Sequence, residues 1–398
     1  MMINLRKSFL DSLEFVNNKT AILRIDLNLP IVDGKVSDFT RMDKILPTIK
    51  GILDRNGKII IISHLGRPKG INNKELSLKP LIPFLEEKIG SNITFCNEDI
   101  FGKKIERLIK KMIPKDILLL ENIRFYHQEE ENDLSFSKRL ASFGDIFINE
   151  SFSTSHRNHS SISGIGTFLP SFPGSLFEFE IKNLSKIFRD SNRKTIAVLG
   201  GAKVSTKLNL INNLAKKFDK ILIGGAMANT FLASLGIDVG NSMKESKLEQ
   251  DAKQLLNDFK GKIIIPDDVI VVNSEKPDSN LTINVDSLSG PENVIMDIGP
   301  KTRKNFYNII SKSEILLWNG PLGFFEKIPF DNGSNYVASI VKVMHSKKFF
   351  SVAGGGDTIS CIKNSGFYEF FSFISTGGGA FLELIEGKNL PGIEILNK

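Results

Sequence analysis

Short runs of Ile, Leu and Val alternate along this chain with longer amphipathic stretches, and most of the apolar runs end abruptly at polar residues or glycine. Apolar runs without alternation are typical of strands buried on both faces of a parallel sheet. Stretches of helical length, such as residues 41–57, separate them. The pattern predicts a parallel α/β fold. The expected strand regions are 20–28, 58–67, 116–124, 145–151, 195–203, 220–227, 262–268, 314–321, 349–357 and 370–379.

Charged and amide side chains follow the strands of the first half, where parallel sheets place their ligands. Lysine is roughly three times as frequent as arginine in the chain, yet these positions carry arginine, whose planar guanidinium grips carboxylate or phosphate in a bidentate way. The pattern favours binding of a small anion with more than one acidic group. The alternative is that each arginine pairs with an acidic residue on the surface. The residues are Asp26, Asn28, Arg41, His64, Arg67, Arg124 and Arg157.

Glycines follow the strands of the second half, at Gly200–Gly201, Gly224–Gly225, Gly354–Gly356 and Gly377–Gly379. Each cluster precedes an expected helix, whose N-terminal N–H groups are suited to phosphate. Ordinary polar loops are the alternative for any single cluster.

The stretch VLGGAKVSTK (198–207) lacks the Walker pattern, because no Gly-Lys pair in the chain is followed by Ser or Thr. Its two lysines, Lys203 and Lys207, are four residues apart and would share a face at a helix start. Asp357 is suited to bind the Mg²⁺ of a nucleotide. The second half therefore predicts a nucleotide site.

The chain is long enough, at 398 residues, to favour two domains. Residues 169–188 begin with two prolines and a glycine and then become amphipathic, which predicts a turn followed by a linking helix. If one half binds a small anion and the other half binds a nucleotide, a group is transferred between them. The arrangement therefore suggests group transfer across a cleft that closes.

The amino-acid composition narrows the class of protein further. The net charge is +7, but the lysines are scattered without an aromatic–basic motif, so we interpret most of them as solvated surface. The chain has no signal-peptide pattern and no apolar run near the roughly 20 residues of a membrane helix. The distant Cys96 and Cys361 suggest reduced thiols and a cytoplasmic protein. The His156–His159 pair lacks a third metal ligand nearby.

From about residue 5 to the end, the motifs and their order resemble those of the phosphoglycerate kinase family. The matching stretches are RIDLNLP (24–30), SHLGRPKG (63–70), LLENIRFY (119–126), TSHRNHSS (154–161), LGGAKVSTK (199–207), IGGAMANTFL (223–232), DIGPKT (297–302), WNGPLGFFE (318–326), AGGGDT (353–358) and STGGGAFLELIEGKNLPG (375–392).

The resemblance implies two Rossmann-like, doubly wound parallel-sheet domains. Their expected bounds are 1–173, a linking helix and hinge at 174–189, 190–370, and a final segment, 371–398, that returns to the first domain. It also implies a monomer that closes around Pro170–Gly174 and reversibly transfers a phosphoryl group from 1,3-bisphosphoglycerate to ADP in glycolysis or gluconeogenesis.

Site roles are implied by the same resemblance. The expected acid-binding residues are Asp26, Leu27, Asn28, Arg41, His64, Leu65, Gly66, Arg67, Arg124 and Arg157. The expected nucleotide-binding residues are Lys207, Glu326, Gly354, Gly355, Gly356, Asp357 and Thr358, with Glu326 at the ribose and Mg²⁺ on Asp357. Arg41, Lys203 and Lys207 are the expected catalytic residues.

In the ATP-consuming direction the nucleophile is a carboxylate, which is ionised at pH 7 and needs no general base.

Three residues depart from the family pattern: Glu150 stands for Asp, Ser153 for a glycine and Ala226 for a third glycine. If the position of Ser153 requires a positive φ, the serine costs about 1 kcal/mol there.

Two other functions are alternatives. A nicotinamide dehydrogenase would carry G-x-G-x-x-G after its first strand and an acid about 20 residues later, and the chain has neither. A basic non-catalytic scaffold that binds nucleotide or nucleic acid gives no reason for arginine at strand ends.

Overall fold

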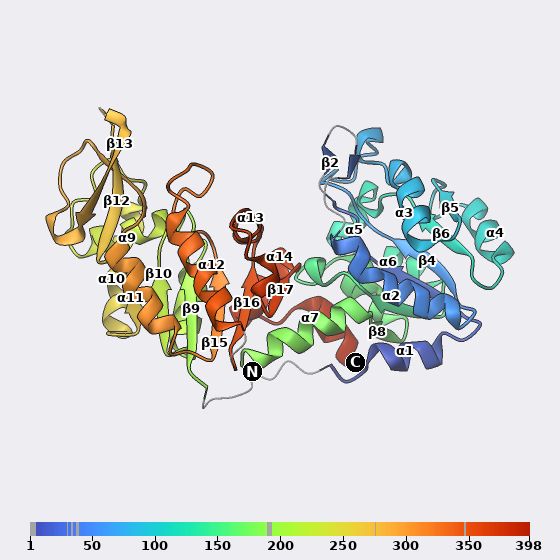
Figure 1. Ribbon diagram of the computed structural model, residues 1–398. Helices are drawn as coiled ribbons and strands as arrows, with labels where there is room; N and C mark the ends of the chain where they lie inside the picture. Colours follow the sequence, from blue (N-terminus) through green and yellow to red (C-terminus); the bar gives the residue numbers. More distant parts are fainter. Residues whose placement is uncertain are drawn as a thin grey trace. The chain divides into compact units, whose positions relative to one another are not determined.

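The computed structural model describes residues 5–29, 31–32, 35–36, 40–188, 193–274, 276–345 and 348–398, with backbone alone at 31–32, 35–36, 40–41 and 276–278. The chain forms two compact units; Figure 1 colours the first from blue to green, except for its last segment, which is dark red, and the second from light green to red. The first comprises Met1–Ser185 and Lys388–Lys398, and the second comprises Lys186–Gly387. By contacts, the segment that rejoins the first unit begins at Lys388, later than residue 371. The domain boundaries predicted from the sequence stay a prediction.

The described part of the first unit contains a six-stranded parallel sheet. Its spatial order is β5 (Ile93–Cys96), β6 (Ile117–Leu120), β4 (Lys58–Ile62), β1 (Thr20–Arg24), β7 (Ile146–Asn149) and β8 (Ser171–Pro173). The chain passes from β1 to β4 on one side and later returns to β7 on the other. The strand order therefore reverses between β1 and β7, where open parallel sheets bind ligands.

The helices of this unit connect or cover those strands. They are α1 (Phe9–Phe15), α2 (Thr40–Asp54), α3 (Ile82–Ile89), α4 (Lys103–Lys111), α5 (His127–Glu131), α6 (Leu134–Ala141), α7 (Ser175–Lys186) and α15 (Pro391–Glu394). A short hairpin pairs β2 (Ile31–Val32) with β3 (Lys35–Val36). The predicted linking helix is α7, and it is preceded by β8 as well as the predicted turn.

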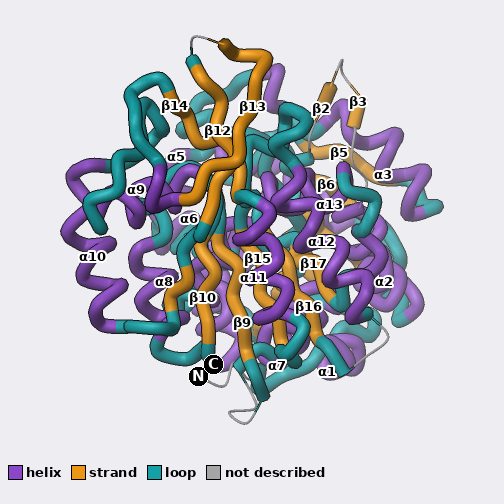
Figure 2. Tube along the Cα trace, turned by 60° about the vertical axis from the view of Figure 1, so that its left-hand side comes forward, coloured by secondary structure: helices purple, strands orange, loops and turns teal. Residues whose placement is uncertain are grey.

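The second unit also contains a six-stranded parallel sheet in its described residues. Its order is β11 (Ile263–Ile264), β10 (Lys220–Ile223), β9 (Thr195–Leu199), β15 (Ile315–Asn319), β16 (Phe350–Gly354) and β17 (Phe373–Ser375). Numbered by appearance in this sheet, this is the 3-2-1-4-5-6 order of dinucleotide-binding folds, with its reversal between β9 and β15. Figure 2 shows β9, β10 and β15 running side by side.

The helices of the second unit are α8 (Leu208–Ala215), α9 (Ala226–Ser234), α10 (Glu249–Asp258), α11 (Pro300–Ile310), α12 (Asn332–Met344), α13 (Gly356–Asn364) and α14 (Gly378–Ile385). A separate antiparallel sheet has the order β13 (Lys276–Asn284), β12 (Asp268–Asn273) and β14 (Asn293–Ile298). In the described part of the chain, no helix combines the length and apolar character needed to cross a membrane.

Burial on both faces explains the continuous apolar runs of the parallel sheets. Ile59 and Ile61 of β4 pack with residues of α2 and α3, while Ile60 and Ile62 point to the opposite face and are also fully buried. Each such side chain stabilises the fold by about 1.5–3 kcal/mol. The predicted parallel α/β class is confirmed, and each of the ten expected regions contains a strand.

Candidate functional site

The expected acid-binding residues follow the carboxyl ends of β1, β4, β6 and β7, around the reversal of strand order. The loops are tied to one another there. The Asn28 Oδ1 atom accepts a 3.0 Å hydrogen bond from the Gly66 N–H, which joins the loops after β1 and β4. Asp26 accepts from the Asn28 N–H at 2.9 Å and from the hydroxyl of Ser153, which follows β7.

A buried arginine, Arg24, lies behind these loops. Its Nη2 atom lies 3.2 Å from His64 Nδ1, and its Nε donates a 3.0 Å hydrogen bond to the Ser161 hydroxyl. Ser161 in turn donates from its N–H and hydroxyl to Glu129, which is fully buried. Burial lowers the pKa of Arg24 to about 10, against the opposing effect of Glu129, so the guanidinium is charged at neutral pH. Because arginine can only donate, His64 Nδ1 must be the acceptor.

Three further arginines differ in exposure. Arg124 is buried and donates a 2.8 Å hydrogen bond to the Gly66 carbonyl, whereas Arg67 and Arg157 are exposed. Burial lowers the pKa of Arg124, and the positive charge of Arg157 lowers it further, while Glu130 and Glu129 raise it. Arg124 and Arg157 therefore bring like charges close enough to interact, which favours binding of an anion. The side chain of Arg41, in the first turn of α2, lies outside the described residues.

In the second unit the loops after β9 and β15 cross closely. The Gly200 N–H donates to the Asn319 carbonyl at 3.0 Å, and a Cβ on Gly200 would lie 2.0 Å from the Pro321 oxygen, so this crossing requires glycine. Lys207 donates from its ammonium group to the carbonyl oxygens of Gly200 at 2.6 Å and Asn319 at 2.9 Å. Burial lowers the pKa of Lys207 to about 8, and the negative charge of Asp357 raises it.

The third glycine cluster begins α13 beside this crossing. Gly355 precedes the helix with φ +100°, a conformation that favours glycine. Asp357 is exposed in the first turn of the helix. The Thr358 hydroxyl accepts a 2.7 Å hydrogen bond from the Gly320 N–H, which ties α13 to the loop after β15.

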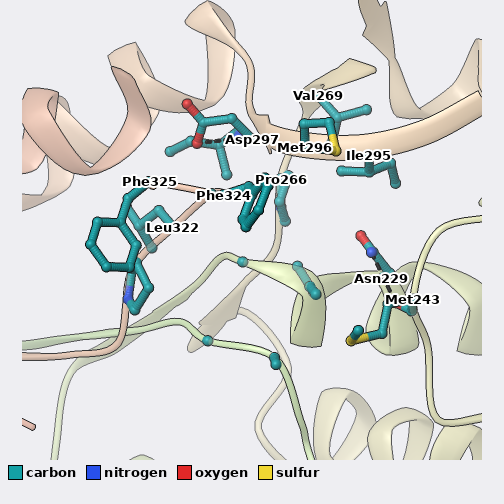
Figure 3. Close-up of a pocket in the computed structure, with 18 of the residues that line it drawn as sticks. Asn229, Met243, Pro266, Val269, Ile295, Met296, Asp297, Leu322, Phe324 and Phe325 are labelled. Atoms are coloured by element: carbon teal, nitrogen blue, oxygen red, sulfur yellow. Dashed lines mark hydrogen bonds between the residues drawn. The ribbon is translucent and has the colours of Figure 1, made fainter. Parts of the chain in front are cut away.

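Two hollows meet at this place. One, which we call the polar hollow because two lysines and an aspartate line it, has a volume of about 340 Å³; its lining includes Lys203, Lys207, Gly355, Gly356 and Asp357. The other, of about 300 Å³, has mainly apolar walls, which Figure 3 shows. Lining residues common to both are Gly201, Ala202, Pro321 and Asp357, so the hollows adjoin. An apolar compartment beside a polar one matches a base with its polyphosphate. Glu326 lines the apolar hollow and Thr358 the polar one, whereas Gly354, the last residue of β16, lines neither.

One expectation about individual residues is wrong, and the condition of another is not met. Lys207 is the N-cap of α8 and Lys203 lies in the preceding turn, so they do not share a helical face, although both line the polar hollow. Ser153 lies in a 3₁₀ helix, Phe152–Thr154, and is absent from the described non-glycine residues with positive φ. The strain expected of this serine is therefore absent there.

The other two departures have structural partners. Glu150 is buried and accepts hydrogen bonds from the Thr48 hydroxyl at 2.5 Å and from the N–H groups of Leu176 and Phe177 at 3.0 Å each. It therefore caps the first turn of α7. Ala226 begins α9 and lines the apolar hollow.

Sequence reasoning missed several residues around the two sites. Arg24 and Asn319 stand inside or at the end of apolar runs, where an interior polar residue is the only signal for them. Ser153 departs from the family pattern in the sequence, but its hydrogen bond to Asp26 depends on the packing of distant loops.

The described residues contain no group of three or more His, Cys, Asp or Glu side chains that could hold a metal ion. Mg²⁺ commonly takes one or two carboxylates from a protein and completes its shell with phosphate oxygens and water. The exposed Asp357 carboxylate, beside both hollows, fits such an ion.

The two doubly wound parallel sheets, each with a reversal of strand order, define the class of α/β proteins that bind ligands at the carboxyl ends of their strands. The model of the family described as phosphoglycerate kinase matches residues 10–388. The chain is 45% identical over 388 residues to the phosphoglycerate kinase of Orientia tsutsugamushi (strain Ikeda), covering 96% of this chain and 95% of that one. It is 42% identical over 392 residues to that of Methylorubrum extorquens (strain PA1), covering 97% and 98%.

Solved structures agree with these relatives. Phosphoglycerate kinase from Coxiella burnetii superposes with a TM-score of 0.87 at 34% identity, and that from Pyrococcus horikoshii OT3 with 0.80 at 30%, each covering 96% of both chains. The chain belongs to the phosphoglycerate kinase family. It is a kinase, and its two-unit fold is that of the family.

Proposed function

We propose that the chain reversibly transfers the phosphoryl group of 1,3-bisphosphoglycerate to ADP, giving 3-phosphoglycerate and ATP. The observation that carries the proposal is the position of Lys207. Its ammonium group lies at the reversal of strand order in the second sheet and lines a polar hollow that adjoins an apolar one.

The first unit would hold the glycerate. Arg67, Arg124 and Arg157 supply guanidinium groups for its carboxylate and phosphate, and Asp26 and Asn28 would meet its hydroxyl. Leu27, Leu65 and Gly66 would contribute backbone groups from the same loops, and Arg41 a further charge. His64 would bind the glycerate and would not transfer protons. The hydrogen bonds that join the loops after β1, β4 and β7 support this role, because they fix the backbone on which these side chains stand.

The second unit would hold the nucleotide. The base would enter the apolar hollow, Glu326 would contact the ribose, and Gly354 to Thr358 would receive the phosphates at the start of α13. Mg²⁺, held by Asp357 and the phosphates, would neutralise charge on the transferring group. The lining of the adjoining hollows supports this assignment.

Catalysis would depend on position and charge. The carboxylate nucleophile is already ionised near neutral pH, so no side chain has to remove a proton from it. Arg41, Lys203 and Lys207 would stabilise the negative charge that spreads over the oxygens of the transferring phosphoryl group. The direct hydrogen bonds of Lys207 to two carbonyl oxygens support a fixed position for one of these charges.

We also infer a cytoplasmic monomer. The burial of both Cys96 and Cys361, which form no disulfide, supports a reducing compartment. Size-exclusion chromatography with light scattering tests the monomer, and a mass of two chains would contradict it.

Separate titrations of the two ligands test the division of roles. Arg67→Met should weaken 3-phosphoglycerate binding at least about tenfold and leave ADP binding unchanged, because an exposed guanidinium that contacts only one ligand is removed. Glu326→Gln should weaken ADP binding and leave 3-phosphoglycerate binding unchanged. If either variant weakens both ligands equally, or neither, the assignment of the ligands to the units is wrong.

A further inference from the structure

The turn that carries Lys203 is held on both sides of this lysine. On one side, the carbonyl oxygen of Gly201 accepts a 3.0 Å hydrogen bond from the N–H of Met227, in the first turn of α9. On the other side, Ser205 is held by a carboxylate, that of Glu245, which belongs to the segment between α9 and α10. Lys203 lies midway between these two points of attachment.

Glu245 binds Ser205 with both of its carboxylate oxygens. Its Oε2 accepts a 2.8 Å hydrogen bond from the Ser205 N–H, and its Oε1 accepts a 2.6 Å hydrogen bond from the Ser205 hydroxyl. The hydroxyl lowers the pKa of Glu245 most, burial opposes it, and the N–H groups of Ser205 and Val204 and the positive charge of Lys203 lower it further. The carboxylate is therefore ionised at neutral pH, and hydrogen bonds to an ionised partner are roughly twice as strong as neutral ones.

The segment that carries Glu245 is itself anchored on α9. The Glu245 N–H donates a 3.0 Å hydrogen bond to the Thr230 hydroxyl, and the Asn229 Nδ2 atom donates one of 3.0 Å to the Met243 carbonyl (Figure 3). Asn229 and Thr230 are each 1% exposed, in a helix that is otherwise mostly apolar. Helix α9 therefore fixes both sides of the lysine turn, one directly and the other through this segment.

Lys203 itself is exposed and lines the polar hollow. Its side chain is long and flexible, so the position of its ammonium group depends on how firmly the backbone of the turn is held. A charge stabilises a transition state best when it is in place before the reaction.

Resting on the proposed phosphoryl transfer, we propose that Glu245 is a positioning residue for this reaction: its carboxylate holds the turn so that the Lys203 ammonium group reaches the transferring phosphoryl group. Glu245 acts through Lys203 and without contact to either ligand.

Steady-state kinetics and calorimetric ADP titration of Glu245→Gln test the proposal. The amide has the same size but only one acceptor oxygen and no charge, so the two-point attachment of Ser205 is lost. The kcat should fall at least about tenfold, because a small displacement of a catalytic group has a large effect on rate. ADP should bind as tightly or more tightly, because a negative charge near the phosphates is removed. Glu249→Gln, the matched control, changes a carboxylate that lies 3.2 Å from Lys244, and it should keep normal turnover.

A second measurement shows whether Glu245 acts through Lys203. When Lys203→Ala is already present, adding Glu245→Gln should change kcat by less than about twofold, because residues that act as a unit have non-additive effects.

Normal turnover of the Glu245→Gln variant overturns the proposal. A loss of ADP affinity as large as the loss of kcat also overturns it, because Glu245 would then support only the structure of the nucleotide site. A full tenfold effect in the Lys203→Ala background contradicts it as well, because the two residues would act independently. In each of these cases the unmodified protein still forms ATP from 1,3-bisphosphoglycerate, whereas failure of the proposed function would leave it without turnover.

Discussion

The ammonium nitrogen of Lys207 lies 2.6 Å from the carbonyl oxygen of Gly200, the residue that follows β9. The same nitrogen lies 2.9 Å from the carbonyl oxygen of Asn319, the last residue of β15. One cation therefore joins the two strands between which the order of the second sheet reverses. Because its charge is fixed by the backbone before any ligand arrives, little reorganisation would be needed when a phosphoryl group passes it.

Replacing Lys207 by alanine should lower kcat by at least about 10²-fold, because a fixed charge that stabilises the transition state is lost. ADP binding should change much less. Lys216→Ala, an exposed lysine at the end of α8, is the matched control and should retain normal turnover. Steady-state kinetics combined with ADP titration measure both quantities, and near-normal turnover of the Lys207 variant would rule out its catalytic role.

The reduced pKa of Lys207, about 8, predicts how activity depends on pH. The ammonium group is charged below this pKa and loses its charge as the pH rises through it. The kcat/KM for ADP should therefore fall above about pH 8. Lys207→Arg, whose guanidinium stays charged, should show no decline in that range. The same decline in both proteins would assign it to another group.

Glu150 predicts an unusual pH dependence of stability. Burial raises its pKa to about 7, although hydrogen bonds from Thr48 and two N–H groups act in the opposite direction. Between its ordinary value of 4.5 and about 7 the folded protein binds more protons at this site than the unfolded chain, so stability falls as the pH rises through that window. The loss is on the order of 3 kcal/mol.

Urea unfolding from about pH 4.5 to above pH 7 measures this loss, and Glu150→Gln should flatten the profile because its amide cannot ionise. Burial also raises the pKa of Asp297 to about 7, so Asp297→Asn should remove a second part of the same slope. If the profile of the Glu150→Gln variant is as steep as that of the unmodified protein, the carboxyl group of Glu150 titrates outside this pH range.

Arg24 should be needed for stability as well as for the orientation of His64. Arg24→Met removes a positive charge that acts on the buried Glu129 and the donor to Ser161, while His159 stays 3.6 Å from Glu129, so the change should cost about 1–3 kcal/mol of unfolding free energy. Arg67→Met, at an exposed position, should change stability by less than about 0.5 kcal/mol. Equal stability of the two variants by denaturant unfolding would contradict the importance of the buried Arg24 network.

Asp357→Asn should separate metal-bound from metal-free nucleotide. With Mg²⁺ the variant should bind ADP more weakly, because a carboxylate ligand of the ion is lost. Without Mg²⁺ it should bind ADP as well or better, because a negative charge near the phosphates is removed. Calorimetric titrations in Mg²⁺ and in chelator make the comparison, and a uniform loss in both would exclude a metal-binding role for Asp357.

The repeating apolar runs predicted the strands of both parallel sheets except β5 and β8, because strands buried on two faces have a sequence pattern that distant contacts do not alter. The antiparallel sheet of β12, β13 and β14 was not predicted. The strand Lys276–Asn284 contains mainly polar residues, and its side chains at 279–282 and 284 are exposed, so its sequence resembles that of a loop.

Site prediction succeeded in naming strand-end residues and failed where a contact depends on tertiary packing. The bond from Ser153 to Asp26 and the capping of α7 by Glu150 join residues that are distant in sequence, and no local pattern encodes them. The turn that places Lys203 before α8 likewise follows from how the loop after β9 meets that after β15. The closure expected around Pro170–Gly174 stays a prediction, which scattering with both ligands bound would test by a decrease in the radius of gyration.

ATP formation on mixing the purified protein with Mg²⁺-ADP and 1,3-bisphosphoglycerate is the direct test of phosphoryl transfer between the two proposed ligands. We expect Mg²⁺-dependent turnover at about 1–10³ s⁻¹, the range of ordinary enzymes. A folded protein that binds ADP and yields no ATP would contradict the account and favour a nucleotide-binding scaffold instead.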